Sequence, residues 1–382
     1  MNLLYTEVED DLRAAVRAVL ADRCPPSAVL GRVESDTPYD PELWRTLAVE
    51  LGLAGLLVPE KLGGQGASAR EVAVVLEELG AAVAPVPLLG SAVLATSALL
   101  GCDVGDAGVA ALLGRLAAGT VTGALAVPLS AVPGAFPGGA SAGSSGSTGS
   151  AGVRADADGW LTGRVTSVAD AFAADVLVVP ALGPDGPALY EVATADARVE
   201  RVVSLDLTRP LADVTFAGPG RRLPGDAVAA LDRALLVGAG LLASEQLGVA
   251  QWCLDETVRY LGERHQFGRV VGSFQALKHR LADVWVEVVS ARAAARDAAD
   301  ALASGEAAGT EARVAVAVAQ AYVAGVAVRA AEEGVQLHGG IGMTWEHPLH
   351  LYLKRAKADE IALGTPAHHR AALAPLVNLP PA

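Results

Sequence analysis

The sequence predicts a multidomain α+β protein with three parts: an all-α N-terminal domain, a middle antiparallel β-sheet or β-barrel and a C-terminal four-helix bundle. Apolar residues recur every three or four positions in the first and last thirds of the chain, as in amphipathic helices. Short alternating segments separated by turn residues lie between them. Hydrophobic residues make up 52% of the 382 residues and aromatic residues 4%, which favours helices packed through small side chains. The expected domains are 1–120, 121–222 and 223–382.

The first third reads as helices joined by glycine turns. Four apolar residues between Val8 and Leu20 repeat at helical spacing, with charged residues on the opposite face. Asp40 can cap a further helix that has Pro41 in its first turn. The following loop, 52–66, is rich in glycine. Its glycines either turn the chain between helices or line the mouth of a ligand site, and the sequence alone leaves both open.

The middle third changes to strand-like periodicity. Turn sequences such as GPDGP and GPG separate its short segments. Residues 133–152 are so dense in glycine and serine that we expect a flexible loop, because such a composition buries little apolar surface. The segments expected to form strands are 159–165, 176–180, 188–192, 199–203 and 213–216.

The last third predicts a bundle of four or five antiparallel helices. The first long helix is expected over 227–262, and the next begins near Ser273, a plausible N-cap. Apolar residues from Phe274 to Ala291 follow a spacing of three and four, typical of a bundle seam. Glycine turns at 264–272 and 338–343 can bring backbone N–H groups close to a ligand.

Charge and cysteine content narrow the classes of function. A net charge of −14 argues against a nucleic-acid or anionic-membrane partner, which would require a basic surface. Three distant cysteines fit a reducing cytoplasm, and no apolar run reaches the ~20 residues of a membrane span. The C-terminal histidines form no ligand repeat such as HExxH, so no metal site is expected. We therefore expect a cytoplasmic protein.

One basic, aromatic-bearing corner, Arg259 to Asp283, stands out in this acidic chain. Arg264, with Lys278 and Arg280, could hold a pyrophosphate through charge-assisted hydrogen bonds, or these residues could form a solvated basic face. The aromatic rings of the corner could equally be core residues. Glutamines such as Gln275 and Gln336 could form hydrogen bonds with the polar edges of a ligand, or they could remain exposed amides.

Several motifs, in order along nearly the whole chain, resemble the acyl-CoA dehydrogenase family, and the resemblance is to its actinobacterial members with a changed catalytic-base position. The resemblance implies the family fold of helical domain, β-barrel and helical bundle. The motifs are GLAGLLVPEKLGGQG (52–66), EELG (77–80), SLDLTRPLADVTF (204–216), RHQFG (264–268), FQALKHRLAD (274–283), QLHGGIGMTWEHP (336–348) and KRAKADEIALGT (354–365).

This resemblance implies a flavoenzyme that dehydrogenates an acyl-CoA thioester at its α and β carbons and transfers a hydride to FAD. FAD would lie between the middle domain of one subunit and the bundle of a neighbour, and an electron-transfer acceptor would reoxidise it. The adenosine arm of FAD would meet the corner, its far end would meet the 336–340 segment, and Thr365 would lie near the flavin. The implied cofactor-binding residues are Arg264, Gln266, Phe267, Phe274, Gln275, Gln336, Gly339, Gly340 and Thr365.

The catalytic residue remains unknown because this chain departs from the family pattern. Leu363 occupies the usual position of the catalytic Glu, and leucine cannot accept a proton. The other position that family members use falls near Gly238. The nearest carboxylates on that helix are Asp232 and Glu245, and Glu245, set between apolar turns, is the substitute base to consider.

The middle domain also departs from the family, because the Gly/Ser-rich insert replaces its flavin-contacting stretch. The resemblance therefore allows two readings: a dehydrogenase, as a homo-oligomer or with a related subunit, or a non-catalytic subunit that completes a partner's FAD site. A third reading keeps the fold but changes the chemistry to that of a flavin-dependent oxidase or hydroxylase.

Overall fold

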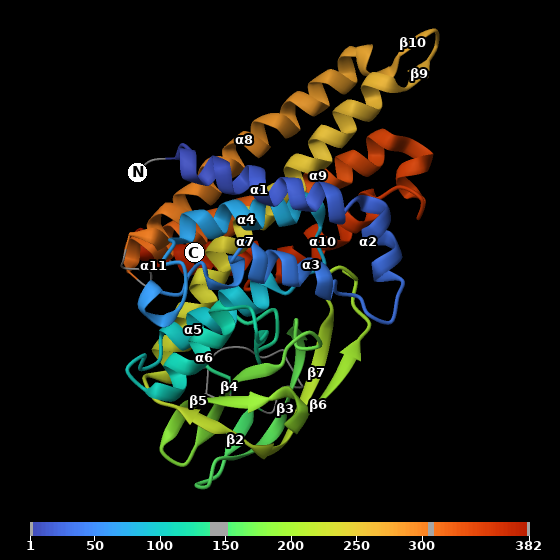
Figure 1. The fold of residues 1–382 in the computed structure, drawn as a ribbon. Helices are drawn as coiled ribbons and strands as arrows, with labels where there is room; N and C mark the ends of the chain where they lie inside the picture. Colours follow the sequence, from blue (N-terminus) through green and yellow to red (C-terminus); the bar gives the residue numbers. More distant parts are fainter. Residues whose placement is uncertain (1–2, 138–151, 305–308, 380–382) are drawn as a thin grey trace.

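The computed structural model describes residues 3–137, 152–304 and 309–379, and it confirms the predicted three-part fold class (Figure 1). Helices from both ends of the chain pack together, and the sheet of the middle part lies at one end of this helical body. Most of the predicted flexible loop, 133–152, falls outside the described residues.

The N-terminal part consists of helices whose starts follow ordinary capping chemistry. Thr6 and Glu9 form a capping box at the start of the first helix, and Ser68 and Glu71 form another before the fourth. A π-helical segment, Leu88–Ala95, continues into α5 without a break. The α-helices are α1 (Glu7–Arg23), α2 (Pro26–Val33), α3 (Pro41–Arg45), α4 (Ala69–Ala82), α5 (Thr96–Leu100) and α6 (Ala107–Ala117).

The middle part is one eight-stranded sheet in the order β6-β7-β3-β2-β4-β5-β8, with β1 beside β4. Most pairs are antiparallel, but β1 and β2 each pair with β4 in parallel, so the sheet is mixed. Among the described strands, β6 and β8 end the path, so the sheet is open where a closed barrel is expected. The strands are β1 (Gly123–Leu125), β2 (Val153–Ala155), β3 (Trp160–Ala169), β4 (Val176–Gly183), β5 (Gly186–Ala193), β6 (Ala197–Val202), β7 (Leu211–Pro219) and β8 (Arg221–Leu223).

The C-terminal part contains the longest helices, and two of them form an arm that projects beyond the rest of the molecule (Figure 1). The short hairpin of β9 (His265–Gln266) and β10 (Arg269–Val270) caps this arm. Ser273 does not cap the following helix, because its hydroxyl donates to the carbonyl of Val270 and Phe274 takes the cap position. The helices are α7 (Ala227–Glu263), α8 (Gln275–Ala303), α9 (Thr310–His338), α10 (Leu349–Ile361) and α11 (Pro366–Leu376).

Glycines allow α4 of the N-terminal part to lie directly against α7 of the bundle. A Cβ atom at Gly80 would lie 2.0 Å from the carbonyl oxygen of Glu245, and one at Gly248 would lie 1.9 Å from that of Glu77. Real Cβ atoms do not approach so closely, so any larger residue would force the helices apart. The two helical parts therefore share one continuous hydrophobic core.

Two segments, Ala227–Glu263 and Thr310–Met343, are long and apolar enough to cross a membrane by length and composition alone. This differs from the expectation that no apolar run is long enough to span a membrane. Within the fold, 78% and 67% of their apolar windows are buried. Packing inside the helical body accounts for their apolar character.

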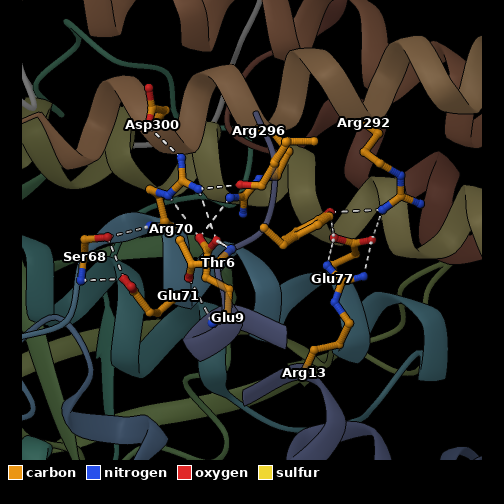
Figure 2. Close-up of polar contacts among 12 residues, drawn as sticks. Thr6, Glu9, Arg13, Ser68, Arg70, Glu71, Glu77, Arg292, Arg296 and Asp300 are labelled. Carbon is orange, nitrogen blue, oxygen red and sulfur yellow. Dashed lines mark hydrogen bonds and ion pairs between the residues drawn. The ribbon is translucent and has the colours of Figure 1, made fainter. Parts of the chain in front are cut away.

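Buried ion pairs also fasten the N-terminal helices to α8 (Figure 2). The carboxylate of Glu9, which is fully buried, accepts hydrogen bonds from Arg70 at 3.0 Å and from Arg296 at 2.8 Å. Arg70 also pairs with Asp300 at 2.7 Å. Burial alone would raise the pKa of Glu9, but the bonds from these two arginines outweigh it and lower the pKa to about 2. Glu9 thus stays ionised and joins α1, α4 and α8.

Candidate functional site

The tip of the arm presents a large aromatic ring to solvent. Phe267 and Gly268 both have positive φ, 53° and 73°, and form the two-residue turn between β9 and β10. The left-handed conformation is unfavourable for a phenylalanine, yet its ring is 90% exposed. Phe274 approaches this ring edge-on at 6.2 Å and is itself covered by the guanidinium of Arg269. A strained, exposed aromatic ring at the end of an arm favours contact with another molecule.

Exposed polar residues flank this turn along the chain. Arg264, Gln266 and Gln275 are all exposed, and Arg264 makes no side-chain ion pair within the described part of the chain. Arg280, by contrast, pairs with Glu333 at 2.6 Å, so it is less available to a ligand than its sequence position suggests. Within the predicted corner, Arg259 to Asp283, the structure thus places the five implied cofactor residues on the exposed hairpin and at the helix ends beside it.

The second predicted segment lies beside the base of the arm. Gln336 is exposed near the end of α9, and Gly339 turns the chain with a φ of 64°. A Cβ atom at Gly340 would meet nothing within 4 Å, so the backbone there is open to approach. Tyr260, one helical turn before Arg264, stacks on His338 with ring centroids 4.2 Å apart. The far-end segment and the corner are therefore neighbours along one side of the arm.

Thr365 lies apart from these residues. It caps α11, where its hydroxyl oxygen accepts from the backbone N–H of His368 at 3.2 Å, and it is exposed. Figure 1 places α11 far from the hairpin. The nine predicted cofactor-binding residues therefore form two separate groups on one chain, eight along the arm and one at the start of α11.

The two positions that could carry a catalytic base lie against each other in an apolar setting. Leu363 is fully buried, has a φ of 53°, and donates its backbone N–H to the carbonyl of Leu129 at 2.7 Å. A Cβ atom at Gly238 would lie 3.1 Å from Cδ1 of Leu363 and 2.4 Å from Cδ2 of Leu94. Leucine side chains thus fill the space in which a carboxylate at either position would lie.

Glu245 lies two helical turns from Gly238, inside a buried ion-pair cluster. Arg209 donates to both of its carboxylate oxygens, at 2.5 and 2.6 Å, and Arg355 donates to one of them. Burial favours the neutral form, but the two arginines outweigh it and lower the pKa of Glu245. An accessible base with a raised pKa is what proton abstraction requires. The arrangement instead gives Glu245 a structural role in the polar network.

Asp359 on α10 completes this cluster. Its Oδ1 accepts from Arg209 at 2.5 Å, whereas its buried Oδ2 has no partner among the described residues. Burial raises the pKa of Asp359 to about 7. Arg355 in turn contacts Asp206 at 2.6 Å. The cluster therefore ties the middle part to α7 and α10 just before the turn that contains Leu363.

Sequence reasoning missed both Leu94 and Arg209. Leu94 belongs to a helix that reads as ordinary core, and only the tertiary contact with Gly238 reveals its position. Arg209 belongs to the motif at 204–216, but nothing in that motif indicates its partner. Its pairing partner Glu245, however, is 36 residues away and follows no local spacing.

Comparisons with known proteins agree with this architecture. Family profiles match residues 6–118 as the acyl-CoA dehydrogenase N-terminal domain and residues 228–376 as the acyl-CoA dehydrogenase C-terminal domain. The acyl-CoA dehydrogenase IpdE2 of Mycolicibacterium smegmatis is 36% identical over 362 residues, covering 94% of this chain and 96% of the relative. IpdE2 of Mycobacterium tuberculosis is 37% identical over 355 residues, covering 93% and 92%.

A solved structure extends the agreement to three dimensions. The ChsE4-ChsE5 complex from Mycobacterium tuberculosis contains a chain that superposes with a TM-score of 0.84 at 29% identity, and each chain is covered completely. The N- and C-terminal family profiles together span more than half of the sequence. This chain therefore belongs to the acyl-CoA dehydrogenase family, whose members are flavoproteins.

Proposed function

We propose that this chain is a subunit of an FAD-dependent acyl-CoA dehydrogenase that removes hydrogens from the α and β carbons of an acyl-CoA thioester. The observation that carries the proposal is the arm, which presents the exposed ring of Phe267 and the unpaired guanidinium of Arg264 beyond the body of the chain. Arg264 makes no ion pair within the described part of its own chain, and Phe267 stays 90% exposed although Phe274 contacts its ring, so a ligand held between chains could use both groups.

The residues on the arm fit a dinucleotide. Arg264 can supply charge-assisted hydrogen bonds to a pyrophosphate, and the rings of Phe267 and Phe274 offer apolar faces to an adenine. The open backbone at Gly339 and Gly340 leaves room for close approach at the other end, where Gln336 can donate to polar edges. Gln266 and Gln275 complete this set. When bound, FAD would accept the β-hydrogen of the substrate as a hydride.

The separation of Thr365 from the arm fits a shared site. One chain would contribute its arm to the flavin of a neighbour and its Thr365 turn to its own side. Exposed apolar side chains on α8, Trp285, Val286 and Val289, offer further surface to a neighbouring subunit. An oligomer of like or related subunits, an acyl-CoA substrate, an electron-transfer acceptor and a cytoplasmic location are part of this proposal.

A second candidate function is that of a subunit that completes the site of a related, base-carrying partner. Two observations favour it. Leucine side chains fill the space at Leu363 and Gly238, and two arginines bind the buried carboxylate of Glu245 and lower its pKa. Removal of an α-proton requires a carboxylate or an equivalent base near the substrate. Leu363 and Gly238 carry no such group, and the carboxylate of Glu245 is engaged by Arg209 and Arg355.

One experiment tests the main proposal and separates it from the second. The full-length chain is purified alone, and its flavin content and visible spectrum are recorded before and after addition of acyl-CoA thioesters. Bound flavin that bleaches with an acyl-CoA supports a dehydrogenase active by itself. Bleaching only after co-expression with a related subunit supports the second candidate, and no flavin in either preparation refutes both.

The variant Arg264→Ala tests the cofactor site directly. It should lower the flavin retained by the assembled oligomer, because a buried phosphate loses a charge-assisted partner worth about 1.5–3 kcal/mol, or roughly 10- to 100-fold in affinity. Arg201→Ala, a change of an arginine on β6 for which the structure gives no side-chain pairing, is the matched control. Flavin content equal to that of the control would refute the role of Arg264.

A further inference from the structure

Three donor groups from separate elements converge behind the turn at Gly339. Glu256 comes from α7, His338 is the last residue of α9, and His347 lies just before α10. One ligand atom of each, a carboxylate oxygen or an imidazole nitrogen, lies within 4.8 Å of those of the other two. Nε2 of His347 lies 3.5 Å from Oε1 of Glu256.

His338 is held with a lone pair directed at this point. It is 3% exposed, and its Nδ1 lies 2.7 Å from the carbonyl oxygen of Gly334, so Nδ1 carries the proton and donates it. Nε2 is then an acceptor, yet it is buried without a partner among the described residues. Stacking on Tyr260 fixes the ring plane. A metal-bound histidine typically shows this pattern, with its second nitrogen donating to a backbone carbonyl.

The other two groups are also suited to bind a cation. Arg259 donates to both oxygens of Glu256, at 2.9 and 2.5 Å, and outweighs burial to lower the pKa of that carboxyl. A carboxylate has about four acceptor positions, so Glu256 can keep Arg259 and still bind a metal. Burial lowers the pKa of His347, as it does that of His338.

His347 must change its tautomer before its Nε2 can bind a metal ion together with Glu256 and His338. Its Nδ1 accepts from the backbone N–H of Leu349 at 3.3 Å, which places the proton on Nε2, facing Glu256. When Nε2 binds a metal ion, this proton moves to Nδ1, and the hydrogen bond from the backbone N–H of Leu349 is lost. The rings of His338 and His347 are tilted by 52° with centroids 4.5 Å apart, and a nitrogen of each lies within 4.8 Å of the other.

We propose that Glu256, His338 and His347 form a site for a divalent transition-metal ion of the zinc class. Two imidazole nitrogens and one carboxylate oxygen are the ligands that zinc accepts when a fourth position is left to water. Both Glu256 and His347 retain 14% and 12% side-chain exposure, which provides access for the ion and for that water. The site joins α7, α9 and α10 beneath the 339–343 turn, and it stands independently of the flavin chemistry proposed above.

The sequence predicts no metal site, because the three ligands follow no repeat. Glu256 and His338 are 82 positions apart, and only the packing of α9 against α7 brings them together. The three histidines of the stretch 338–350, His338, His347 and His350, lie close together: the ring of His338 contacts that of His347, and His350 stacks on Trp345.

The test uses the full-length chain, purified without a polyhistidine tag, stripped with a chelator and supplied with FAD. Co²⁺ and Zn²⁺ are titrated by calorimetry, and Co²⁺ also by its visible absorption, which reports coordination number. One equivalent per chain is expected, with the Co²⁺ spectrum of a four-coordinate site. Binding of neither ion up to millimolar concentration overturns the proposal.

Three conservative variants identify the ligands. In His338→Asn, the amide can still donate toward Gly334, and in His347→Asn its oxygen can still accept from Leu349; Glu256→Gln keeps the shape of the carboxylate. Each should weaken binding by more than the ~10- to 100-fold that second-shell changes cause. His350→Asn, which removes a histidine of the same cluster outside the trio, is the matched control. Equal losses in the control and the three variants overturn the assignment.

A measurement on the unmodified chain guards against variants that fail to fold. Zn²⁺ should raise the melting temperature progressively with the logarithm of its concentration, because only the folded chain assembles the three ligands. The rise should vanish when EDTA is added. A melting temperature that does not respond to Zn²⁺ overturns the proposal without recourse to any variant.

Discussion

Filling the space next to Leu363 is the sharpest test of the packing at the base position. The variant Gly238→Ala adds one methyl group that would lie 2.4 Å from Cδ2 of Leu94 and 3.1 Å from Cδ1 of Leu363. Overpacking of a buried site costs about 1–3 kcal/mol, whereas alanine in place of glycine in a helix gains about 1 kcal/mol. We therefore expect a net loss of up to about 2 kcal/mol of unfolding free energy.

The matched control is Gly325→Ala on α9, where a Cβ atom would meet nothing within 4 Å. This variant should gain only the stabilisation of about 1 kcal/mol that alanine has over glycine in a helix. The unfolding free energies of the two alanine variants should therefore differ by about 1–3 kcal/mol. The measurement is urea unfolding at fixed protein concentration, followed by two spectroscopic probes so that any intermediate is detected.

A second mutation shows whether Leu94 is the neighbour responsible. Leu94→Ala alone should cost about 2–5 kcal/mol, because it opens a cavity in the core. In that background the added methyl at position 238 finds room, and Gly238→Ala should become stabilising. The coupling between the two changes should reach about 1–3 kcal/mol. Equal stabilisation by Gly238→Ala and Gly325→Ala in the unaltered chain would refute the packing described at the base position.

Three further perturbations follow from the buried cluster and the arm. Arg209→Met should lower the unfolding free energy by about 3–5 kcal/mol, because Glu245 and Asp359 lose a buried partner. Urea unfolding measures this loss, with Arg201→Met as the control. A loss equal to that of the control would contradict the prediction. Since burial raises the pKa of Asp359 to about 7, the folded state keeps a proton that the unfolded state loses near pH 4, so this group's contribution falls by up to about 4 kcal/mol as the pH rises from 4 to 7. Asp359→Asn should flatten the pH dependence of the unfolding midpoint over that window, and an unchanged slope would count against a proton on Asp359. Phe267→Gly should relieve the left-handed strain without reducing the unfolding midpoint, yet it should lower flavin retention in the oligomer; full retention would show that the exposed ring does not serve the cofactor.

Much of the fold could be predicted because its signals are local. The helices begin at residues whose side chains cap them, as at Thr6, Asp40 and Ser68, and the apolar spacing of the last third corresponds to long helices. Ser273 shows the limit of this reasoning. Its hydroxyl donates to Val270 in a short 3-10 turn instead, so a residue type that favours caps took a different local bond.

What escaped prediction depends on contacts between distant residues. The parallel pairing of β1 and β2 with β4 follows from the path of the chain through the middle part, which no alternation pattern records. The apolar filling of the Gly238 position depends on Leu94, and the state of Glu245 depends on Arg209 and Arg355. The corner at Arg264 was foreseeable because its residues are consecutive in the sequence, whereas the convergence of Glu256 with two histidines was not.

The ion pairs between α1 and α8 also constrain the order in which the molecule can form. Glu9 reaches its partner Arg296 across 287 positions, so three quarters of the chain must be synthesised before this carboxylate is paired. Until then, Glu9 has Arg70 and the backbone N–H of Thr6 as hydrogen-bond partners among the described residues of the N-terminal part. The first helix of the chain can therefore complete its ion pairs only after α8 has been made, and a fragment ending before α8 should leave α1 weakly docked and open to proteolysis.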